Sequence, residues 1–337
     1  MTGPYHMPLE TDPHQRTFMQ WPVNLDVYGH ASLRRTQSAI ARIANAIAQF
    51  EPVVMLAERT HHASTRRLLS ADVLLWDVPT DDLWCRDCGP TFVRAADGSF
   101  AVMDFNFNGW GNKQPHANDA LVARRVADRL GLPWIDSGVV GEQGGLEHDG
   151  AGLVLAHASS WVNPNRNSAD AQVIGDRLLA AVGGRKMIWA PGVSGADITD
   201  YHIDSLARFV GPGKVLIQLP ARLDTNDPWS ASAFETLEIL HGATDGAGNP
   251  IDIVTLPEPV NIRGRGSDFV ASYVNYYICN GAVIGAQFGD ETADERASAV
   301  LAELYPEREI VLLNVDALGA SGGGIHCATQ QQPRAGS

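Results

Sequence analysis

Apolar residues near the N-terminus first follow a helical period and then form a continuous run. Residues 31–50 carry one stripe of apolar side chains at helical spacing, made up of Leu33, Ile40, Ile43, Ile47 and Phe50. The segment PVVMLAE, which begins at Pro52, is apolar almost without interruption, as in a buried strand. The pattern therefore predicts a helix that leads into a buried strand.

Strand-like segments recur along the rest of the chain, and most of them have a turn in the middle. Gly, Asp or Asn interrupts four of these segments at a central position, which is typical of β-hairpins. The predicted hairpins are PTFVRAADGSFAVMDFNFN, GGLEHDGAGLVLAHASSWV, HIDSLARFVGPGKVLIQLP and ASYVNYYICNGAVIGAQFGD. The segment ADVLLWDVP has no such turn and is predicted to be a single strand.

Helices are predicted between these segments, at residues 117–130, 168–182 and 292–304. Gly131 and Gly183 directly follow the first two, and glycine is common just past the end of a helix. Thr292 and Glu295 have capping-box spacing at the start of the third. A unit of two or three strands plus one helix thus recurs about every 60 to 70 residues. We expect a single α/β domain over residues 1–337, built from radially or serially repeated units.

Composition and charge argue against several classes of protein. With 337 residues, of which 45% are hydrophobic and 19% charged, the chain can bury a large core. No run approaches the roughly 18 apolar residues of a membrane span, and the N-terminus lacks the blocks of a signal peptide. We therefore expect a cytoplasmic protein with no membrane partner. The net charge of −14 argues against nucleic acid as a partner, because binding to phosphates needs clustered Lys and Arg.

The cysteines are too few for a disulfide scaffold in a chain of this length; they are Cys85, Cys88, Cys279 and Cys327. The first two form a C-x-x-C pair, which occurs in redox proteins. However, Asp87 lies inside the pair, no second pair completes a zinc site, and the segment runs into a strand. Asp87 itself is expected either to form a surface salt bridge with Arg86 or to point into a pocket at the start of the strand.

Candidate acid and base residues lie in two further segments. Glu142 is followed closely by Gly144 and Gly145, and such small residues let a ligand approach the backbone. His202 and Asp204 are two residues apart, so a strand would place both on one face, either a solvated face or that of an acid-base pair. Nearby carboxylates favour the protonated form of His202, which could then donate a proton.

The C-terminal segment LGASGGGIHC combines a glycine run with two candidate nucleophiles. Ser321 lies in a G-x-S-x-G sequence, but no Asp or Glu follows it to complete the triad of an α/β-hydrolase with His326. Cys327 is the stronger candidate, because a thiolate is intrinsically reactive; the alternative is a core cysteine. Carboxylates beside a cysteine nucleophile make sense for a cationic substrate. A guanidinium is a planar, permanent cation that carboxylates bind bidentately.

A series of segments from Met7 to Pro333 matches known motifs in family order. They are MPLETDPHQRTFMQWP, WCRDCGPTFV, DFNFNGWGNK, EQGGLEHDGAG, WVNPNRN, TDYHIDSLARFV, ASYVNYYICNGAVIGAQFGD and GGGIHCATQQQP. Through them the chain resembles the agmatine deiminase and bacterial peptidyl-arginine deiminase family of the pentein, or guanidino-group-modifying, superfamily. The resemblance implies a five-bladed α/β propeller, the pentein fold, of pseudo-repeated ββαβ units around a central site.

The resemblance also implies the catalytic residues. The nucleophile of the G-G-G-I-H-C motif falls on Cys327. The histidine and the aspartate that follows it in T-D-x-H-x-D fall on His202 and Asp204. The aspartate of W-x-R-D-x-G-P falls on Asp87, and the glutamate of the E-G-G segment falls on Glu142. The three carboxylates are expected to bind the guanidinium as well.

The implied reaction is the hydrolytic deimination of a guanidino compound to a ureido compound and ammonia, through a covalent thiouronium intermediate on Cys327. It requires no metal and no organic cofactor. Agmatine, converted to N-carbamoylputrescine, is the first expected substrate, and peptidyl arginine or free arginine is the alternative. Transfer of the amidino group to an amine, as by an amidinotransferase, ranks behind hydrolysis.

Other parts of the implied site are less defined. Trp110 and Asn108 in NFNGWGNK are expected to bind the substrate, with Trp110 either as a stacking face or as a core residue. Relatives often form homo-oligomers, although nothing in these residues requires one. The departures from the family pattern are expected to line or support the pocket mouth, so that the substrate depends on them. These departures are Gln143 for a glycine, Glu147 for a histidine, Tyr201 for a small residue, and Ser159 or Ser160 for a cysteine.

Overall fold

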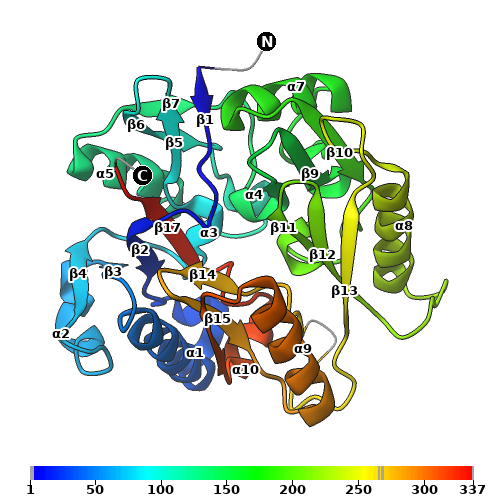
Figure 1. Ribbon diagram of the computed structural model, residues 1–337. Helices are drawn as coiled ribbons and strands as arrows, with labels where there is room; N and C mark the ends of the chain where they lie inside the picture. Colours follow the sequence, from blue (N-terminus) through cyan, green and yellow to red (C-terminus); the bar gives the residue numbers. More distant parts are fainter. Residues whose placement is uncertain (1–3, 265, 267–268, 336–337) are drawn as a thin grey trace.

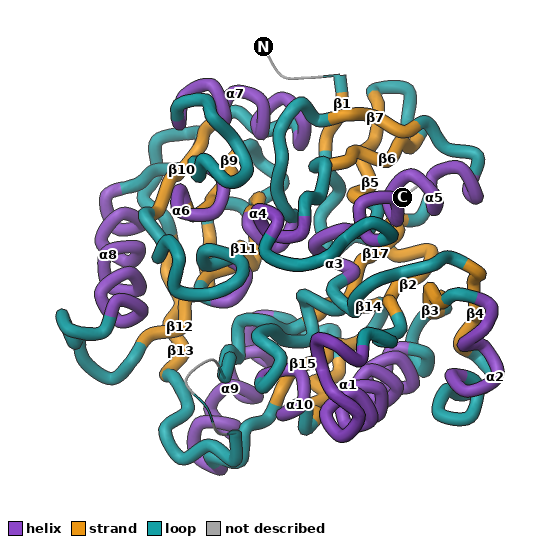
Figure 2. The backbone as a smooth tube through the Cα atoms, turned by 180° about the vertical axis from the view of Figure 1, so that it is seen from behind, coloured by secondary structure: helices purple, strands orange, loops and turns teal. Residues whose placement is uncertain are grey.

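The computed structural model describes residues 4–264, 266 and 269–335. Strands in this part of the chain form five separate sheets of three or four strands each, in a mixed α/β fold. Figure 1 shows the sheets around the middle of the molecule, with α1, α5, α7, α8 and α9 on the outside. The view from behind shows the same arrangement (Figure 2).

Four sheets are each built on a hairpin, a helix and a strand that runs parallel to the second hairpin strand. The first two units are β5 (Thr91–Ala95), β6 (Phe100–Asp104), α5 (Val122–Leu130) and β7 (Trp134–Asp136), and then β8 (Leu146–His148), β9 (Leu153–His157), α7 (Ala171–Val182) and β10 (Lys186–Ala190). The next two are β11 (Ala207–Gly211), β12 (Lys214–Leu219), α8 (Pro228–Gly242) and β13 (Asp252–Pro257), and then β14 (Tyr277–Cys279), β15 (Ala282–Ala286), α9 (Glu291–Leu304) and β16 (Glu309–Leu313).

The fifth sheet joins the two ends of the chain. Its strands are β2 (His14–Gln20), β3 (Val53–Ala57), β4 (Val73–Asp77) and the C-terminal β17 (Thr329–Pro333), with α1 (Leu25–Ile47) between β2 and β3. Strand β17 pairs antiparallel with β2, with Thr329 opposite Met19. This pairing fixes the segment just before β17, so the C-terminal glycine-rich segment is not a loose tail.

Short elements connect these units. Strand β1 (Tyr5–His6) pairs with β5 at the edge of the first sheet. The one-turn helices are α2 (His62–Thr65), α3 (Cys85–Cys88), α4 (Gly109–Asn112), α6 (Ala158–Trp161) and α10 (Asp316–Gly319). Short 3-10 turns occur at Arg59–His61, Asp119–Leu121, Gln143–Gly145 and Ile203–Ser205.

The structure confirms most of the predicted elements. All four hairpins form, as β5–β6, β8–β9, β11–β12 and β14–β15. Helices α5 and α7 end at Gly131 and Gly183, which adopt left-handed backbone angles with φ of 67° and 76°. The predicted capping box at Thr292 and Glu295 is wrong. Helix α9 begins one residue before Thr292, and Asp290 caps it by accepting a hydrogen bond from the Ala293 N–H.

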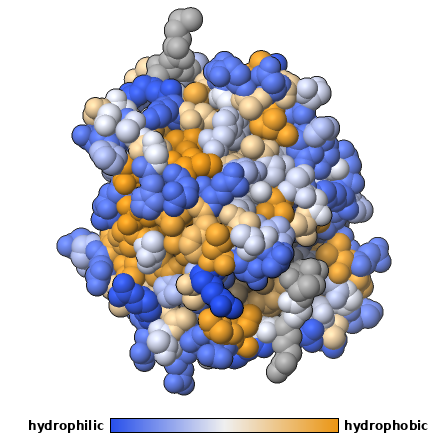
Figure 3. Space-filling model, turned by 90° about the vertical axis from the view of Figure 1, so that its right-hand side faces the viewer, coloured by the Kyte–Doolittle hydropathy of each residue, from blue (hydrophilic) through white to orange (hydrophobic). Residues whose placement is uncertain are grey.

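The helix predicted over residues 31–50 is α1, which begins earlier and ends at Ile47. Ile40, Ile43 and Ile47 on its predicted stripe are completely buried against the fifth sheet and its neighbours. The side of the molecule that carries α8 shows hydrophobic residues among hydrophilic ones (Figure 3). None of the helices in the described residues has the length and apolar character of a membrane span.

Candidate active site

The five predicted catalytic residues lie in segments that directly precede the first strand of a unit. Asp87 is on α3 before β5, and Glu142 precedes the 3-10 turn that leads into β8. His202 and Asp204 come just before β11, and Cys327 comes two residues before β17. Helix α3 contacts β17 and the 3-10 turn Gln143–Gly145, and this turn contacts the 3-10 turn Ile203–Ser205.

The prediction that His202 and Asp204 share one face of a strand is wrong. Asp204 lies within the 3-10 turn Ile203–Ser205, and His202 directly precedes that turn. Gly144 shows how closely the groups converge nevertheless. A Cβ atom at Gly144 would lie 2.9 Å from Oδ1 of Asp87, 2.9 Å from Nδ1 of His202 and 3.1 Å from Oδ2 of Asp204.

Glu142 and Arg166 hold His202 at one side of the site. Nε2 of His202 lies 3.0 Å from Oε2 of Glu142. The Nε atom of Arg166 donates to both oxygens of Glu142, at 2.9 and 3.0 Å, and all three side chains are buried. Burial alone raises the pKa of Glu142, but the hydrogen bond with His202 and the charge of Arg166 lower it below its ordinary value. Glu142 is therefore an anion that orients His202.

His202 is held in its protonated form by the carboxylates around it. Burial alone lowers the pKa of His202, but Asp87 and Glu142 overcome this effect and raise it to about 9. Nδ1 of His202 lies 3.6 Å from Oδ1 of Asp87, which completes a contact on each ring nitrogen. At neutral pH the ring is an imidazolium that can donate a proton.

Asp87 offers a free acceptor inside the site. Its Oδ2 accepts a hydrogen bond of 2.9 Å from the indole N–H of Trp110, whereas its buried Oδ1 accepts none from the described residues. Burial raises the pKa of Asp87 to about 7, although the charge of His202 opposes this rise. A cationic N–H donor would satisfy Oδ1 and favour the ionised carboxylate.

Cys327 is a thiol in the free enzyme. Burial raises the pKa of Cys327 well above its ordinary value, and the charges of Asp204 and Asp87 raise it further. Its sulfur lies 3.6 Å from Oδ2 of Asp204 and 3.1 Å from Nδ2 of Asn275. The thiol therefore needs an added positive charge nearby to become a thiolate.

Sequence reasoning missed Asn275, which contacts both the sulfur of Cys327 and the backbone around it. Its Oδ1 accepts from the Cys327 N–H at 3.3 Å, and its Nδ2 donates to the Asp204 carbonyl at 3.3 Å. Asn275 lies two residues before β14, as Cys327 does before β17, and the other site residues lie three to five residues before their own strands. Each of the five sheets thus contributes a residue to the centre, and this repeated position is the signal that could have identified Asn275.

The other predicted substrate-binding residues have structural contacts. Trp110 is only 2% exposed, packs edge-on against Phe107 and donates to Asp87, so its side chain belongs to the core and reaches the site through its N–H. Asn108 caps α4 by accepting from the Gly111 N–H and donates to the Asn165 carbonyl. Stacking of Trp110 on a substrate and a substrate contact by Asn108 stay predictions.

Most departures from the family pattern lie away from Cys327. Gln143 accepts a hydrogen bond from the Thr91 hydroxyl, and Glu147 pairs with Arg208. Gln143 and Glu147 line a cavity that is described below. Tyr201 has a positive φ of 70° and packs between the rings of His157 and Trp229. The hydroxyl groups of Ser159 and Ser160 donate to the carbonyls of Asp200 and His157.

The structure does not favour the other sites that the sequence suggested. Cys85 and Cys88 are free and buried, and burial raises the pKa of both thiols, which opposes redox chemistry. Arg86 is buried and pairs with Glu10, so the predicted surface salt bridge between Arg86 and Asp87 is wrong. The Ser321 hydroxyl donates to the Ala317 carbonyl. Within the described residues, no group of three or more His, Cys, Asp or Glu could hold a metal ion.

Comparisons with known proteins agree over the whole chain. The family model of Porphyromonas-type peptidyl-arginine deiminases matches residues 6–333. A Streptomyces coelicolor protein with a provisional name as an agmatine deiminase is 37% identical, over 98% of this chain and 99% of its own. The agmatine deiminase of Medicago truncatula is 32% identical, over 98% and 96%.

A solved structure gives the same result. The agmatine deiminase of Enterococcus faecalis superimposes with a TM-score of 0.90 at 29% identity, over 98% of this chain and 96% of that chain. The matched segments include all five predicted catalytic positions, because the family model extends from residue 6 to residue 333. This chain therefore belongs to the family of Porphyromonas-type peptidyl-arginine deiminases and is an enzyme of the deiminase type, a hydrolase that acts on carbon–nitrogen bonds.

Proposed function

We propose that the enzyme hydrolyses the guanidino group of a small cationic substrate, and that this substrate is agmatine, which gives N-carbamoylputrescine and ammonia. The observation that carries the proposal is the buried Oδ1 of Asp87, which accepts no hydrogen bond from the described residues and converges on Gly144 together with Nδ1 of His202 and Oδ2 of Asp204. The relatives named as agmatine deiminases support agmatine as the first choice.

Asp87 and Asp204 accept the guanidinium N–H groups, and Glu142 accepts one more. Bidentate contacts of this kind fix the plane of the cation, so its carbon lies about 3 to 3.5 Å from the sulfur of Cys327. The bound cation also offsets the negative charges that raise the pKa of Cys327 in the free enzyme. Substrate binding therefore generates the thiolate where it is needed.

The reaction then follows in two displacements. The Cys327 thiolate attacks the guanidinium carbon, a C–S bond forms, and the tetrahedral adduct collapses as the C–N bond breaks. His202 donates its proton to the departing ammonia and afterwards removes a proton from water. That water attacks the thiouronium carbon, the C–S bond breaks, the remaining hydroxyl proton passes to the solvent, and the neutral ureido product leaves with the thiolate restored. Atoms and charge balance without a metal or an organic cofactor.

The fold is the basis of this arrangement. We propose that the five sheets are the blades of an α/β propeller, which is supported by the repeated hairpin–helix–strand unit and by the pairing of β17 with β2. The chain then forms one catalytic domain, and residues 1–3 and 336–337 at its ends lie outside the described residues. Free, buried cysteines are compatible with a cytoplasmic enzyme.

The test is ammonia release from agmatine, free arginine, a blocked arginine peptide and shorter guanidino acids. We expect turnover of agmatine above the others, and none with Cys327→Ala or Cys327→Ser. Selective turnover of the blocked peptide would instead assign a peptidyl-arginine deiminase. Ammonia release by a folded Cys327→Ala variant would reject the assigned nucleophile.

A further inference from the structure

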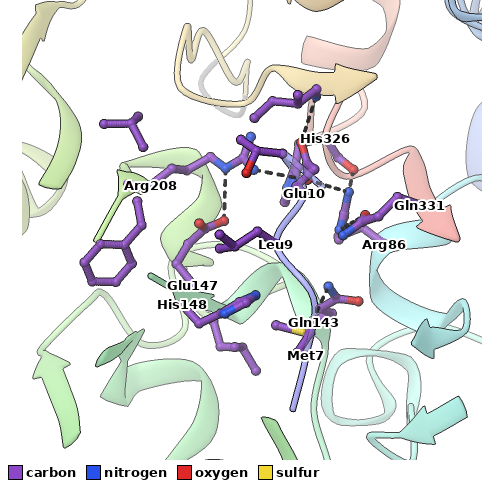
Figure 4. A pocket seen from close by; sticks show the side chains of 16 residues that line it. Met7, Leu9, Glu10, Arg86, Gln143, Glu147, His148, Arg208, His326 and Gln331 are labelled. Atoms are coloured by element: carbon purple, nitrogen blue, oxygen red, sulfur yellow. Dashed lines mark hydrogen bonds and ion pairs between the residues drawn. The ribbon is translucent and has the colours of Figure 1, made fainter. Parts of the chain in front are cut away.

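A buried cluster of charged residues lies directly beside the catalytic segment. It is built around Glu10, which comes from the N-terminal segment between β1 and β2 (Figure 4). Oε2 of Glu10 lies 2.9 Å from Nε2 of His326, 3.1 Å from Arg86 and 3.1 Å from Arg208. Glu147 pairs with Arg208 at 3.0 Å from the other side. These side chains line a cavity of about 50 Å³.

His326 connects this cluster to the catalytic carboxylate. Its Nδ1 lies 2.7 Å from Oδ2 of Asp204, and its Nε2 faces Glu10. Carboxylates only accept hydrogen bonds, so both contacts form only when both ring nitrogens carry a hydrogen. The side chain of His326 is 3% exposed, and Asp204 is completely buried. A buried cation is therefore fixed against the oxygen of Asp204 that lies next to Cys327.

The same cluster also fixes the backbone that carries the nucleophile. The Arg86 N–H donates to the Cys327 carbonyl at 3.0 Å, and Nε of Arg86 donates to the His326 carbonyl at 3.3 Å. Glu10 compensates the charges of Arg86 and Arg208, which would otherwise repel a protonated His326. The N-terminal segment thus supports the catalytic segment more than 300 residues away, because Glu10 contacts both His326 and Arg86.

We propose that His326 is a positioning residue of this enzyme and that Glu10 acts through it, so that Asp204 stays ionised and its Oδ2 stays beside the sulfur of Cys327. The positioning role rests on the proposed function only for the reaction whose kcat/KM is measured. Asp204 is the group affected because its buried charge has His326 as its closest hydrogen-bond partner. The other charged or titratable groups that act on it are Asp87, Glu147, His157, His202, Arg208 and Cys327.

Two substitutions of His326 separate its two contacts. The amide of His326→Asn can replace Nδ1 and donate to Asp204, whereas the amide of His326→Gln replaces Nε2 and reaches Glu10 only. We expect kcat/KM to fall roughly tenfold to hundredfold in His326→Gln, the effect of losing a hydrogen bond to a charged group, and clearly less in His326→Asn. His148→Gln is the matched control, because it makes the same exchange at another histidine that lines the cavity, and burial lowers the pKa of His148 to about 4, so the exchange removes no charge.

A second measurement does not depend on the substrate. Chloroacetamidine is a cation and chloroacetamide is neutral, and the Cys327 sulfur displaces chloride from both. The ratio of their labelling rates, followed by mass spectrometry of the Cys327 peptide, reports the negative charge beside the thiol. We expect this ratio to fall about tenfold in His326→Gln, because burial raises the pKa of Asp204 once its partner is lost and the carboxyl becomes neutral, and to stay near the wild-type value in His148→Gln. The acid limb of kcat/KM, which Asp87 sets in the wild type, should also move to higher pH in His326→Gln alone, because Asp204 then titrates in it as well.

The outcomes separate the two proposals. Wild-type kcat/KM, labelling ratio and acid limb in a folded His326→Gln variant would overturn the positioning role. Equal losses in His326→Asn and His326→Gln, with an unchanged labelling ratio, would reduce His326 to a packing residue and overturn it as well. If the wild type releases no ammonia from any guanidine but the labelling ratio falls as expected from the wild type to His326→Gln, the proposed function fails while the positioning role stands.

Discussion

Trp110 donates its indole N–H to Oδ2 of Asp87 at 2.9 Å, and this bond leaves Oδ1 of Asp87 as the free oxygen that faces His202. The bond fixes the carboxylate plane. It also favours the ionised form of Asp87, whose pKa burial raises to about 7. A tryptophan with a buried ring can thus still control substrate binding.

Trp110→Phe should therefore weaken catalysis most at low pH. Loss of the N–H raises the pKa of Asp87 further, so fewer molecules carry the charged carboxylate at neutral pH. We expect a fall in kcat/KM of roughly tenfold at pH 7 and a smaller fall at pH 8.5. Trp134→Phe is the matched control, because Trp134 donates to Asp104 at 2.8 Å outside the site. Equal effects of both substitutions at both pH values would contradict this role of Trp110.

The pH dependence of kcat/KM should be bell-shaped, with limbs near pH 7 and pH 9. Asp87 must be ionised to bind the cation, so activity falls as the pH drops through its pKa of about 7. His202 must be protonated to assist the departure of ammonia, so activity falls as the pH rises through its pKa of about 9. The profile of kcat/KM reports the free enzyme, to which these values apply. A flat profile between pH 6 and pH 10 would rule out both assignments.

Arg166 should contribute to stability as well as to the site. It is buried, and it pairs with Glu142 through Nε and with Asp200 at 2.7 Å through Nη1. Arg166→Met leaves both carboxylates without this partner, which costs about 3 to 5 kcal/mol in the free energy of unfolding. In contrast, Lys214→Met breaks the exposed pair with Asp252 and should cost less than about 1 kcal/mol. Urea unfolding measures both values, and similar losses would contradict the difference in burial.

The local parts of this structure could be predicted from the sequence. Turn residues determine the four hairpins, and Gly131 and Gly183 end helices where only a left-handed residue fits. Helix α8 was missed for a physical reason. Its buried face consists of Ser230, Ser232, Ala233, Thr236 and Leu240, which form no apolar stripe.

The catalytic residues could be predicted by motif, whereas their supports could not. Glu10 meets His326, and Asn275 meets Cys327, only because the sheets bring distant segments to the middle of the molecule. The i and i+2 spacing of His202 and Asp204 also has two solutions. A strand and a 3-10 turn can both carry it, and only the surrounding fold selects the turn.

Gly144 gives the most direct test of how closely the site is built. An added Cβ atom would lie 2.9 Å from both Asp87 and His202, closer than side-chain carbons normally approach. The φ angle of Gly144 is not in the left-handed region, so alanine strains no backbone there and acts only on its neighbours. Displacing a reacting group by about 1 Å can cost 100-fold in rate. We expect a loss of about this size in kcat/KM for Gly144→Ala.

The control for this substitution is Gly242→Ala at the end of α8, where a Cβ atom meets nothing within 4 Å. Gly242→Ala should unfold at nearly the wild-type urea concentration. Gly144→Ala should stay folded but lose about 1 to 3 kcal/mol in the free energy of unfolding, because its Cβ atom displaces buried neighbours. Only Gly144→Ala should lose turnover. If Gly144→Ala keeps full activity, the guanidinium does not bind in the space that a Cβ atom at Gly144 would enter, next to Asp87 and His202. Other carboxylates must then hold the substrate.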